Sequence, residues 1–285
     1  MHHELLGLFR TSSENVRISV TKSRHSPSFP RFSIAWYLTD TTVSIRALSI
    51  GLVDVAITYT PIAEKLAIDQ GIAEPDGRYY IFRDHFLIVG PRSNPAKIVT
   101  SGENGSRDCC LGIFSRLHRA AEEAARPGWT GGSVRFLSRF DKSATNIKES
   151  ELWLSIGQVP WATAVSTWYH SYISFPQQAL RAAILLEEYT LTDLSTYLSL
   201  PAGFHDQVRI YKAGSDEADD PLLLPGHLLV GTKATNKEMA REFAEWVAGP
   251  LGQDVVAGFK KGGRQLYSPA PVGEKREVRD VRAKL

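Results

Sequence analysis

The stretch LTDTTVSIRALSIGLVDVAITYTPIAEK, residues 38–65, indicates the fold more clearly than any other part of the chain. Residues 40–50 have a capping residue followed by helical spacing, and Gly51 is placed to end that helix. The nearly continuous apolar run VDVAITY, residues 53–59, is typical of a buried parallel strand. Pro61 suits the first turn of a second helix. This order of elements predicts an α/β fold with a parallel sheet and right-handed crossovers.

The alternation extends outward from this stretch over most of the chain. After a strand at residues 85–89, the breaker GPRSNPA marks a place where the chain leaves one lobe for another, and LSLPAGFHD marks its return. We expect lobe 1 to contain residues 1–90 and 206–285, and lobe 2 to contain residues 91–205. Periodicity also predicts strands at 32–38, 134–137, 208–211 and 227–231, and helices at 111–125, 143–156, 177–188, 235–248 and 250–259. Thr235 and Glu238 predict a capping box for the helix at 235–248.

Composition excludes several classes of protein. The chain has 285 residues, 43% of them apolar, which supply enough material for a core. The 33 Lys and Arg residues are interspersed with 31 Asp and Glu residues, so we expect no nucleic-acid partner. A run of eighteen apolar residues is absent, so we expect no membrane insertion. Residues 1–17 are too poor in apolar residues to be a signal peptide, which leaves the localisation unknown at this point.

Enzyme and cofactor signatures are absent from the sequence. It contains no nucleotide-binding glycine loop, no HExxH, no GxSxG and no CxxC pair, so we expect neither a catalytic residue, nor a cofactor, nor a metal site. The adjacent Cys109 and Cys110 rarely reach disulfide geometry without strain, and we interpret both as small buried or half-buried apolar residues.

The segment RFLSRFDKSATNIKESELW, residues 135–153, has the chemistry of an anion site. An apolar strand leads into a loop with hydroxyl groups and one arginine, and a helix follows. The N–H groups of a helix start carry partial positive charge, to which Ser138, Ser143 and Thr145 add hydroxyl donors and Arg139 a planar charged fork. In the alternative interpretation, Ser143 or Thr145 only caps the helix, and Arg139 pairs with Asp141 at the surface.

A second loop of this kind contains Thr41 and Thr42, between a strand and a helix in LTDTTVS. On its own it is an ordinary helix cap. If the two loops belong to different lobes and face each other, they form a clamp for one small anion, because ligands of open α/β sheets bind at such strand ends.

Two further features have competing interpretations. Trp153, Trp161 and Trp168 could form a stacking surface, although we expect them to be core residues of the second lobe. The acidic loop at residues 216–220 does not match an EF-hand spacing, and we interpret it as a solvated loop rather than a calcium site.

The chain resembles the tungstate-binding proteins of bacterial ABC uptake systems, and most closely their extracellular relatives from filamentous fungi. The resemblance runs in order from residue 38 to residue 201, through the stretch quoted first, FRDHFLIVGPRSNPA, FLSRFDKSATNIKESELW, WYHSYI and LEEYTLTDLSTYLSLP. The C-terminal AREFAEWVAGPLGQDVVAGF is similar to the closing helices of that family. The resemblance implies a type II periplasmic-binding-protein-like fold: two α/β lobes joined by two hinge strands, which together form one domain and hold an oxyanion between them.

The resemblance also implies site residues. The family loop Ser-Arg-Gly-Asp followed by Ser-Gly-Thr corresponds to residues 138–141 and 143–145, and its Gly-Thr-Gly loop to residues 40–42. The family segment Asp-Arg-Gly-Thr corresponds to residues 193–196, which places Asp193 in the ligand site but replaces the arginine. The glycines of all three loops are also replaced, and ISFPQ at residues 173–177 takes the place of a Gly-Gln-Gly-Met-Gly loop, so the pocket could hold a different ligand.

The N-terminal part departs from the family. Residues 1–31 lack the family's opening strand and helix, so we expect the N-terminal part of lobe 1 to be incomplete. Thr11, Ser12 and Ser13 lie at a plausible distance before Thr41 to correspond to the family's Thr/Thr/Ser loop.

We therefore expect a solute-binding protein that holds an oxyanion such as tungstate or molybdate, with Thr41, Thr42, Ser138, Arg139, Ser143, Thr145 and Asp193 as ligand-binding residues. We expect it to be a monomer. The resemblance further suggests a secreted or extracellular protein with a membrane permease as partner. Two alternatives stay open: a ligand-divergent sensing or interaction module on the same fold, and a small-molecule enzyme built on it, for which Asp141 and Asp193 are the available general bases.

Overall fold

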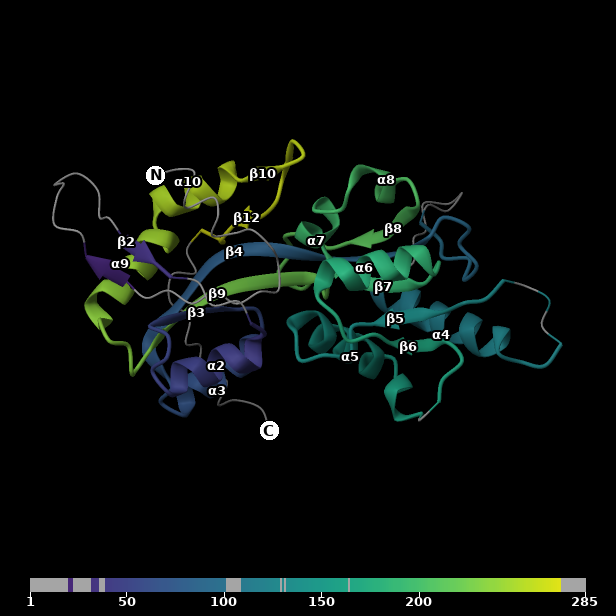
Figure 1. The fold of residues 1–285 in the computed structure, drawn as a ribbon, viewed down its shortest axis with the longest axis horizontal. Helices are drawn as coiled ribbons and strands as arrows, with labels where there is room; N and C mark the ends of the chain where they lie inside the picture. Colours follow the sequence, from purple (N-terminus) through teal and green to yellow (C-terminus); the bar gives the residue numbers. More distant parts are fainter. Residues whose placement is uncertain are drawn as a thin grey trace.

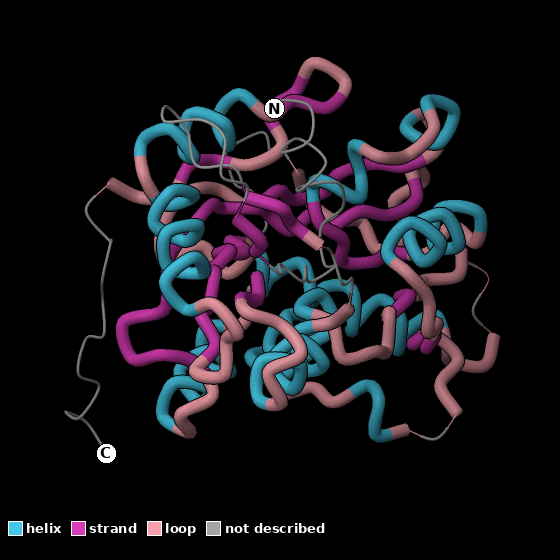
Figure 2. The backbone as a smooth tube through the Cα atoms, turned by 60° about the vertical axis from the view of Figure 1, so that its left-hand side comes forward, coloured by secondary structure: helices cyan, strands magenta, loops and turns pink. Residues whose placement is uncertain are grey.

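The computed structural model describes residues 20–22, 32–35, 39–100, 109–128, 130, 132–163 and 165–272. Strands run through the middle of the molecule, with helices around them, and the chain forms two halves that lie side by side (Figures 1 and 2). The described residues thus have a mixed α/β architecture, as the sequence predicted.

One long strand forms the first of two connections between the halves, and the second is a loop, residues 214–222, where a hinge strand was expected. β4 (Ala73–Pro91) has 19 residues and runs from one half into the other (Figure 1). Its residues 73–85 pair with β9 (Leu223–Gly231), and its residues 86–91 pair with β7 (Tyr189–Asp193) and β8 (Val208–Ala213). The sequence predicted only residues 85–89 of β4, because the preceding part is interrupted by charged residues and lacks a clean apolar pattern.

The first half contains both ends of the described chain. Its helices are α2 (Thr41–Ser49), α3 (Pro61–Asp69), α9 (Lys237–Ala248) and α10 (Pro250–Gly258), and its sheet is formed by β3 (Val55–Thr58), β9 and most of β4. The expectation that residues 53–59 form a parallel strand is wrong, because β3 pairs antiparallel with β9. All four residues of β3 are buried, and a fully buried antiparallel strand has the same continuous apolar run as a parallel one.

The second half contains the parallel pairs. β5 (Phe136–Ser138) pairs parallel with β6 (Tyr169–Ser171) and with β7, whereas β7 is antiparallel to β4. The described sheet is therefore mixed and not purely parallel. The helices of this half are α4 (Cys110–Ala124), α5 (Ala144–Ser155), α6 (Pro176–Leu185), α7 (Leu194–Leu198) and α8 (Ala202–His205), with a 3-10 turn at Pro160–Ala162.

The position of β8 bears on the lobe boundary. This strand follows residue 206, where the sequence placed the return to lobe 1, yet it pairs with residues 87–91 of β4 in the second half. The chain crosses back only in the loop 214–222, where a Cβ at Gly214 would lie 2.5 Å from the carbonyl oxygen of Leu222. We therefore propose lobes of residues 39–85 with 222–272, and of residues 86–213.

Short pairings complete the described fold. β1 (Val20–Lys22) pairs with β2 (Phe32–Ile34), and β10 (Lys260–Lys261) pairs with β11 (Arg264–Gln265), both in antiparallel fashion. β12 (Ser268–Pro269) pairs with residues 82–83 of β4. The candidate residues Thr11, Ser12 and Ser13 lie outside the described residues. None of the described helices is both long and apolar enough to cross a membrane.

Local signals located most helices correctly, but the predicted cap of α9 is wrong, and so is the expected burial of Cys109. α9 is capped by Asn236, whose side chain accepts a hydrogen bond from the Met239 N–H, so the predicted capping box of Thr235 is wrong. The Thr235 N–H instead donates a hydrogen bond to the Asp54 side chain. In a capping box this N–H would have bonded to Glu238. Cys109 is exposed and caps α4 through its sulfur, whereas Cys110 is buried as expected.

Candidate functional site

The anion loop predicted from the sequence lies between β5 and α5, on the second half of the molecule. β5 ends at Ser138, the loop covers residues 139–143, and α5 begins at Ala144. Phe140 in this loop has φ 45°, in the left-handed region that bulky residues rarely adopt. Phe140 stands where the family that the chain resembles has glycine. The left-handed backbone conformation is kept although the residue is phenylalanine, which adds backbone strain.

The carboxylate of Asp141 is the centre of this loop. Its Oδ1 accepts hydrogen bonds from the N–H of Ser143 at 2.9 Å and from the Ser143 hydroxyl at 2.5 Å. Its Oδ2 lies 2.6 Å from Nη2 of Arg139. The ion pair that the alternative interpretation expected is present, but Arg139 is buried, with 7% of its surface exposed, and is not a surface residue.

The remaining loop residues are buried around the start of α5. The Ser138 hydroxyl accepts from the N–H of Phe140 at 3.1 Å and from the side chain of Asn146 at 3.2 Å. Ser143 caps the helix by accepting from the Asn146 N–H. Thr145 is buried in the first turn. The structure thus brings Ser138, Arg139, Ser143 and Thr145 together, because they belong to one strand–loop–helix unit.

Glu149 lies one turn further along α5, and the sequence analysis missed it. It is buried and accepts a hydrogen bond of 2.7 Å from the Tyr169 hydroxyl. Burial raises its pKa to about 7, against the opposing effect of hydrogen bonds from Tyr169 and Ser138. The sequence could have indicated Glu149, because it follows Thr145 by four residues and so lies on the helix face that carries the loop's polar side chains.

Asp193 lies at the end of β7 and caps α7. It accepts hydrogen bonds from the N–H and the hydroxyl of Thr196, at 2.7 and 2.8 Å, and from the Ser195 hydroxyl at 3.0 Å. Burial raises its pKa, although these hydrogen bonds and the charge of Arg139 oppose the rise. An ionised carboxylate only accepts hydrogen bonds, so any part of Asp193 in an anion site is indirect.

A second buried carboxyl group, which the sequence analysis also missed, lies beside Asp193. Asp84 is fully buried at the point where β4 passes from one half to the other. Burial raises its pKa well above the usual range, and the negative charge of Asp193 raises it further. No sequence motif predicts this pair, because Asp84 and Asp193 come from strands that are distant in the sequence.

Thr41 and Thr42 lie on the other half, in the first turn of α2. Thr41 is buried, Thr42 is exposed, and Asp40 caps the helix by accepting from the Val43 N–H at 2.9 Å. Among the described residues, no hydrogen bond or ion pair joins these threonines to the loop of Ser138 and Arg139. Their place in a shared site stays a prediction.

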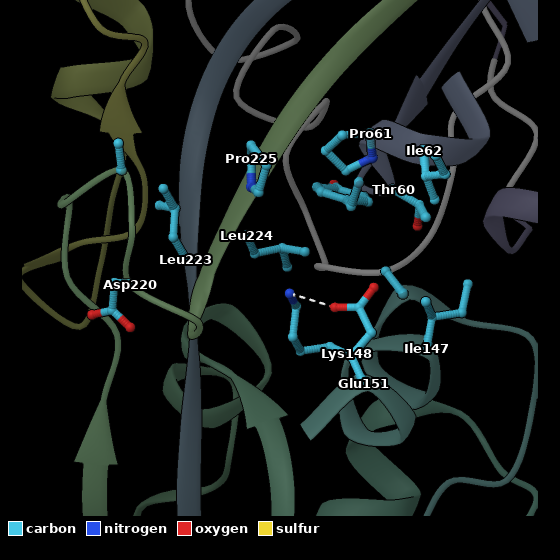
Figure 3. A pocket seen from close by; sticks show the side chains of 13 residues that line it. Thr60, Pro61, Ile62, Ile147, Lys148, Glu151, Asp220, Leu223, Leu224 and Pro225 are labelled. Atoms are coloured by element: carbon cyan, nitrogen blue, oxygen red, sulfur yellow. Dashed lines mark ion pairs between the residues drawn. The ribbon is translucent and has the colours of Figure 1, made fainter. Parts of the chain in front are cut away.

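A cavity of about 350 Å³ separates the two halves. Figure 3 shows Thr60, Pro61 and Ile62 on one side, Ile147 and the ion-paired Lys148 and Glu151 of α5 on the other, and Leu224 between them. Ala144, which lies between Ser143 and Thr145 in the chain, also lines the cavity, so the cavity reaches the first turn of α5. Its volume corresponds to about ten water molecules, more than one small oxyanion fills.

A buried network holds the opposite wall of the cavity. The Glu64 carboxylate accepts from the Thr58 hydroxyl at 2.7 Å, the Thr60 N–H at 3.1 Å and the Arg78 guanidinium at 2.9 Å. Burial alone raises the pKa of Glu64, but His227 and Arg78 outweigh it and lower the pKa below its usual value. The loop that begins α3 is therefore fixed by charge-assisted hydrogen bonds.

In the described part of the chain, no group of three His, Cys, Asp or Glu side chains is arranged so that it could hold a metal ion. Two residues of the acidic loop instead make side-chain contacts within the protein. Asp216 pairs with His85 at 2.9 Å, and Asp220 accepts from Ser215 and Leu222.

Comparison with known proteins gives consistent matches over most of the chain. Residues 25–250 match the family model of the PBP superfamily domain. A crystal structure of a periplasmic protein with a suggested metal-binding role is 60% identical, covers 83% of this chain and 84% of its own, and superposes with a TM-score of 0.76.

More distant matches are tungstate-binding proteins named TupA. The protein from Peptoclostridium acidaminophilum is 22% identical over 275 residues, which is 90% of this chain and 85% of its own. The structure of the protein from Desulfovibrio alaskensis G20 has a TM-score of 0.64 at 22% identity, and the match covers 85% of this chain and 87% of that one. At this identity the structural likeness concerns the fold.

Proposed function

The chain belongs to the PBP superfamily, and from this membership we propose that it is a solute-binding protein that holds a small oxyanion in the cleft between its two lobes. One observation carries the proposal. Three donors of the loop 139–143, namely the Arg139 guanidinium and the N–H and hydroxyl of Ser143, already converge on the two oxygens of one carboxylate. A loop that binds the oxygens of Asp141 has the donor geometry that an oxyanion requires.

The proposed ligand is a tetrahedral oxyanion of the tungstate or molybdate kind. Arg139 supplies the charge, and Ser138, Ser143, Thr145 and the first N–H groups of α5 supply further donors. Thr41 and Thr42 are proposed as the contribution of the other lobe. Support for the ligand class comes from the relatives, which carry the name tungstate-binding protein.

Closure of the lobes is part of the proposal. The cavity of about 350 Å³ has walls from both halves, but none of the proposed ligand residues lines it, so the lobes have to move relative to each other before both contact one anion. The crossing at residues 85–86 and the loop 214–222 are the two places where the chain can bend to allow this.

The proposed setting is outside the cytoplasmic membrane, with delivery of the anion to a membrane permease. The 60%-identical relative is described as periplasmic, which supports this location. No catalytic step is proposed, because the relatives reported above are described as binding proteins and the donor set of the loop requires only binding.

The test is a calorimetric titration with tungstate, molybdate, sulfate and phosphate. We expect Arg139→Ala to weaken binding at least about tenfold, because a charge-assisted hydrogen bond contributes roughly 1.5 to 3 kcal/mol and about 1.4 kcal/mol is a factor of ten. Arg139→Lys should recover only part of the affinity, since an ammonium lacks the planar fork.

Arg181, which is exposed on α6 in the same lobe, provides the matched control. Arg181→Ala removes the same charge and should change the affinity less than about twofold. If the parent protein binds none of the four anions, or if Arg139→Ala binds as well as the parent, the oxyanion proposal is wrong and a ligand-divergent interaction module takes its place.

A further inference from the structure

We infer that Asp141 is a built-in competitor for the anion site: its carboxylate occupies the donors that the ligand needs, and binding requires its displacement. This inference rests on the proposed function, because it concerns the same loop. In this inference, Asp141 sets how tightly the site binds an anion.

The hydrogen bonds of Asp141 are the first argument. A serine hydroxyl has one proton, and the Ser143 hydroxyl donates it to Asp141 at 2.5 Å. The Ser143 N–H is directed to the same oxygen at 2.9 Å. An incoming anion can therefore obtain neither donor of Ser143 while Asp141 stays in place.

The pattern of these contacts distinguishes a competitor from a residue that only orients Arg139. An orienting carboxylate needs a contact with the guanidinium alone and leaves the helix start open to the ligand. Asp141 contacts Nη2 of Arg139 with one oxygen and both donors of Ser143 with the other. It takes the position of a ligand that bridges the arginine and the start of α5.

Asp141 is also placed so that it can leave. Its side chain is 21% exposed, whereas that of Arg139 is 8% exposed. Its neighbours in the loop, Phe140 and Lys142, are both exposed. A rotation of the Asp141 side chain toward solvent restores its hydration and leaves the more deeply buried Arg139 and Ser143 to the incoming anion.

The charge around Arg139 explains why the competition should be measurable. Asp193, which is buried, lies close enough for the charge of Arg139 to oppose the rise that burial causes in its pKa. Arg139 is thus already balanced by Asp141 on one side and influenced by Asp193 on the other. Removal of the Asp141 carboxylate therefore lowers the cost of freeing these donors by the same amount for every incoming anion.

The test compares Asp141→Asn with the parent, using tungstate, a dianion, and perrhenate, a monoanion with the same tetrahedral set of four oxygens. Asparagine keeps an acceptor for the Ser143 N–H but has no charge for Arg139. We expect both anions to bind about tenfold more tightly, by nearly the same factor, because displacing a neutral amide costs less than displacing the carboxylate, whichever anion binds.

Equal factors separate competition from simple repulsion. A carboxylate that only repels the ligand acts in proportion to ligand charge, so its removal would change the logarithm of the affinity for tungstate about twice as much as that for perrhenate. That outcome, or weaker binding of both anions by Asp141→Asn, or an unchanged affinity, would overturn the inference.

Two further variants keep the result interpretable. Asp141→Ala should tighten binding in the same direction, which excludes an effect of the new amide group. Asp206→Asn, at an exposed residue of the same lobe, makes the same change in net charge and should leave both affinities unchanged.

The failure of this inference can be told apart from the failure of the proposed function. If the parent binds tungstate through Arg139 and Asp141→Asn does not bind it more tightly, only the role of Asp141 is wrong. If neither the parent nor Asp141→Asn binds any anion, the oxyanion function itself is wrong, and the inference fails with it.

Discussion

The Tyr169 hydroxyl donates a hydrogen bond of 2.7 Å to the buried carboxyl group of Glu149, about one helical turn beyond the end of the loop 139–143. The two side chains come from β6 and α5, so the bond ties the helix that begins at the loop to the strand beside it. Burial raises the pKa of Glu149 from 4.5 to about 7. Folding therefore favours the protonated form of this group.

The raised pKa of Glu149 predicts a loss of stability with rising pH. A carboxyl group with a higher pKa in the folded state contributes fully below its unfolded pKa, and the contribution is lost as pH rises toward the folded pKa. Between pH 4.5 and about 7 the free energy of unfolding should fall by roughly 1.4 kcal/mol per pH unit from this group. Urea denaturation of the parent and Glu149→Gln at pH 5, 6, 7 and 8 measures it.

The difference between the two proteins is the informative quantity, because Asp84 and Asp193 also have raised pKa values and act in the same direction in both. Glu149→Gln should gain in stability relative to the parent as pH rises from 5 to 7. A constant difference over this range would show that Glu149 is not the group responsible.

The tryptophans of the second lobe should differ in their contribution to stability. Trp153 is fully buried and packs edge-on against Phe114 and Phe136, with ring centroids 4.6 and 5.2 Å apart. Trp153→Ala should destabilise the protein by roughly 3 to 5 kcal/mol. Trp161 is only partly buried against the same core, so Trp161→Ala should cost clearly less. Thermal and chemical denaturation measure both losses of stability. Equal losses for Trp153→Ala and Trp161→Ala would contradict the placement of Trp153 deeper in the core.

Two of the four acidic residues in the loop 214–222, Asp216 and Asp220, should contribute differently to stability. Asp220 accepts from the N–H and hydroxyl of Ser215, at 2.8 and 2.6 Å, and from the Leu222 N–H at 2.8 Å. Asp220→Ala should cost roughly 1 to 3 kcal/mol, because hydrogen bonds to a charged acceptor are lost. Asp216 is partly exposed and pairs with His85 and Arg83, so Asp216→Ala should cost less than about 1 kcal/mol.

The pH dependence provides a check on Asp220. Partial burial alone raises its pKa, but the hydrogen bonds from Ser215 and Leu222 lower it below the usual 3.8. Its contribution to stability is therefore present above pH 3.8 and is lost as pH falls further. Asp220→Ala should lack this loss in acid denaturation, and Asp216→Ala should retain it.

The cap of α9 can be tested with two neighbouring residues. Asn236→Ala removes the acceptor of the Met239 N–H and should cost about 1 kcal/mol. Thr235→Ala keeps the backbone N–H that donates to Asp54, so its effect should stay within about 0.5 kcal/mol. If chemical denaturation showed a larger loss of stability for Thr235→Ala than for Asn236→Ala, Thr235 would be the cap, as the sequence pattern predicted.

The helices and the position of the loop 139–143 between a strand and a helix could be predicted from the sequence because their signals are local. Asp40 caps α2, Gly51 follows its end with φ 69°, and Ser143 caps α5, each through atoms a few residues away. The cluster of Ser138, Arg139 and Ser143 could be predicted for the same reason, because one loop of the chain carries all three.

The direction of β3, the full length of β4 and the place of β8 followed only from the fold in three dimensions. These features depend on pairings such as that of Leu87 with Ala213, which no local pattern specifies. The buried carboxyl pair of Asp84 and Asp193 arises in the same way, where β4 and β7 meet between the lobes. Local capping and periodicity act over one turn of chain, whereas strand pairing and the pKa of a buried group depend on residues that only the folded packing brings together.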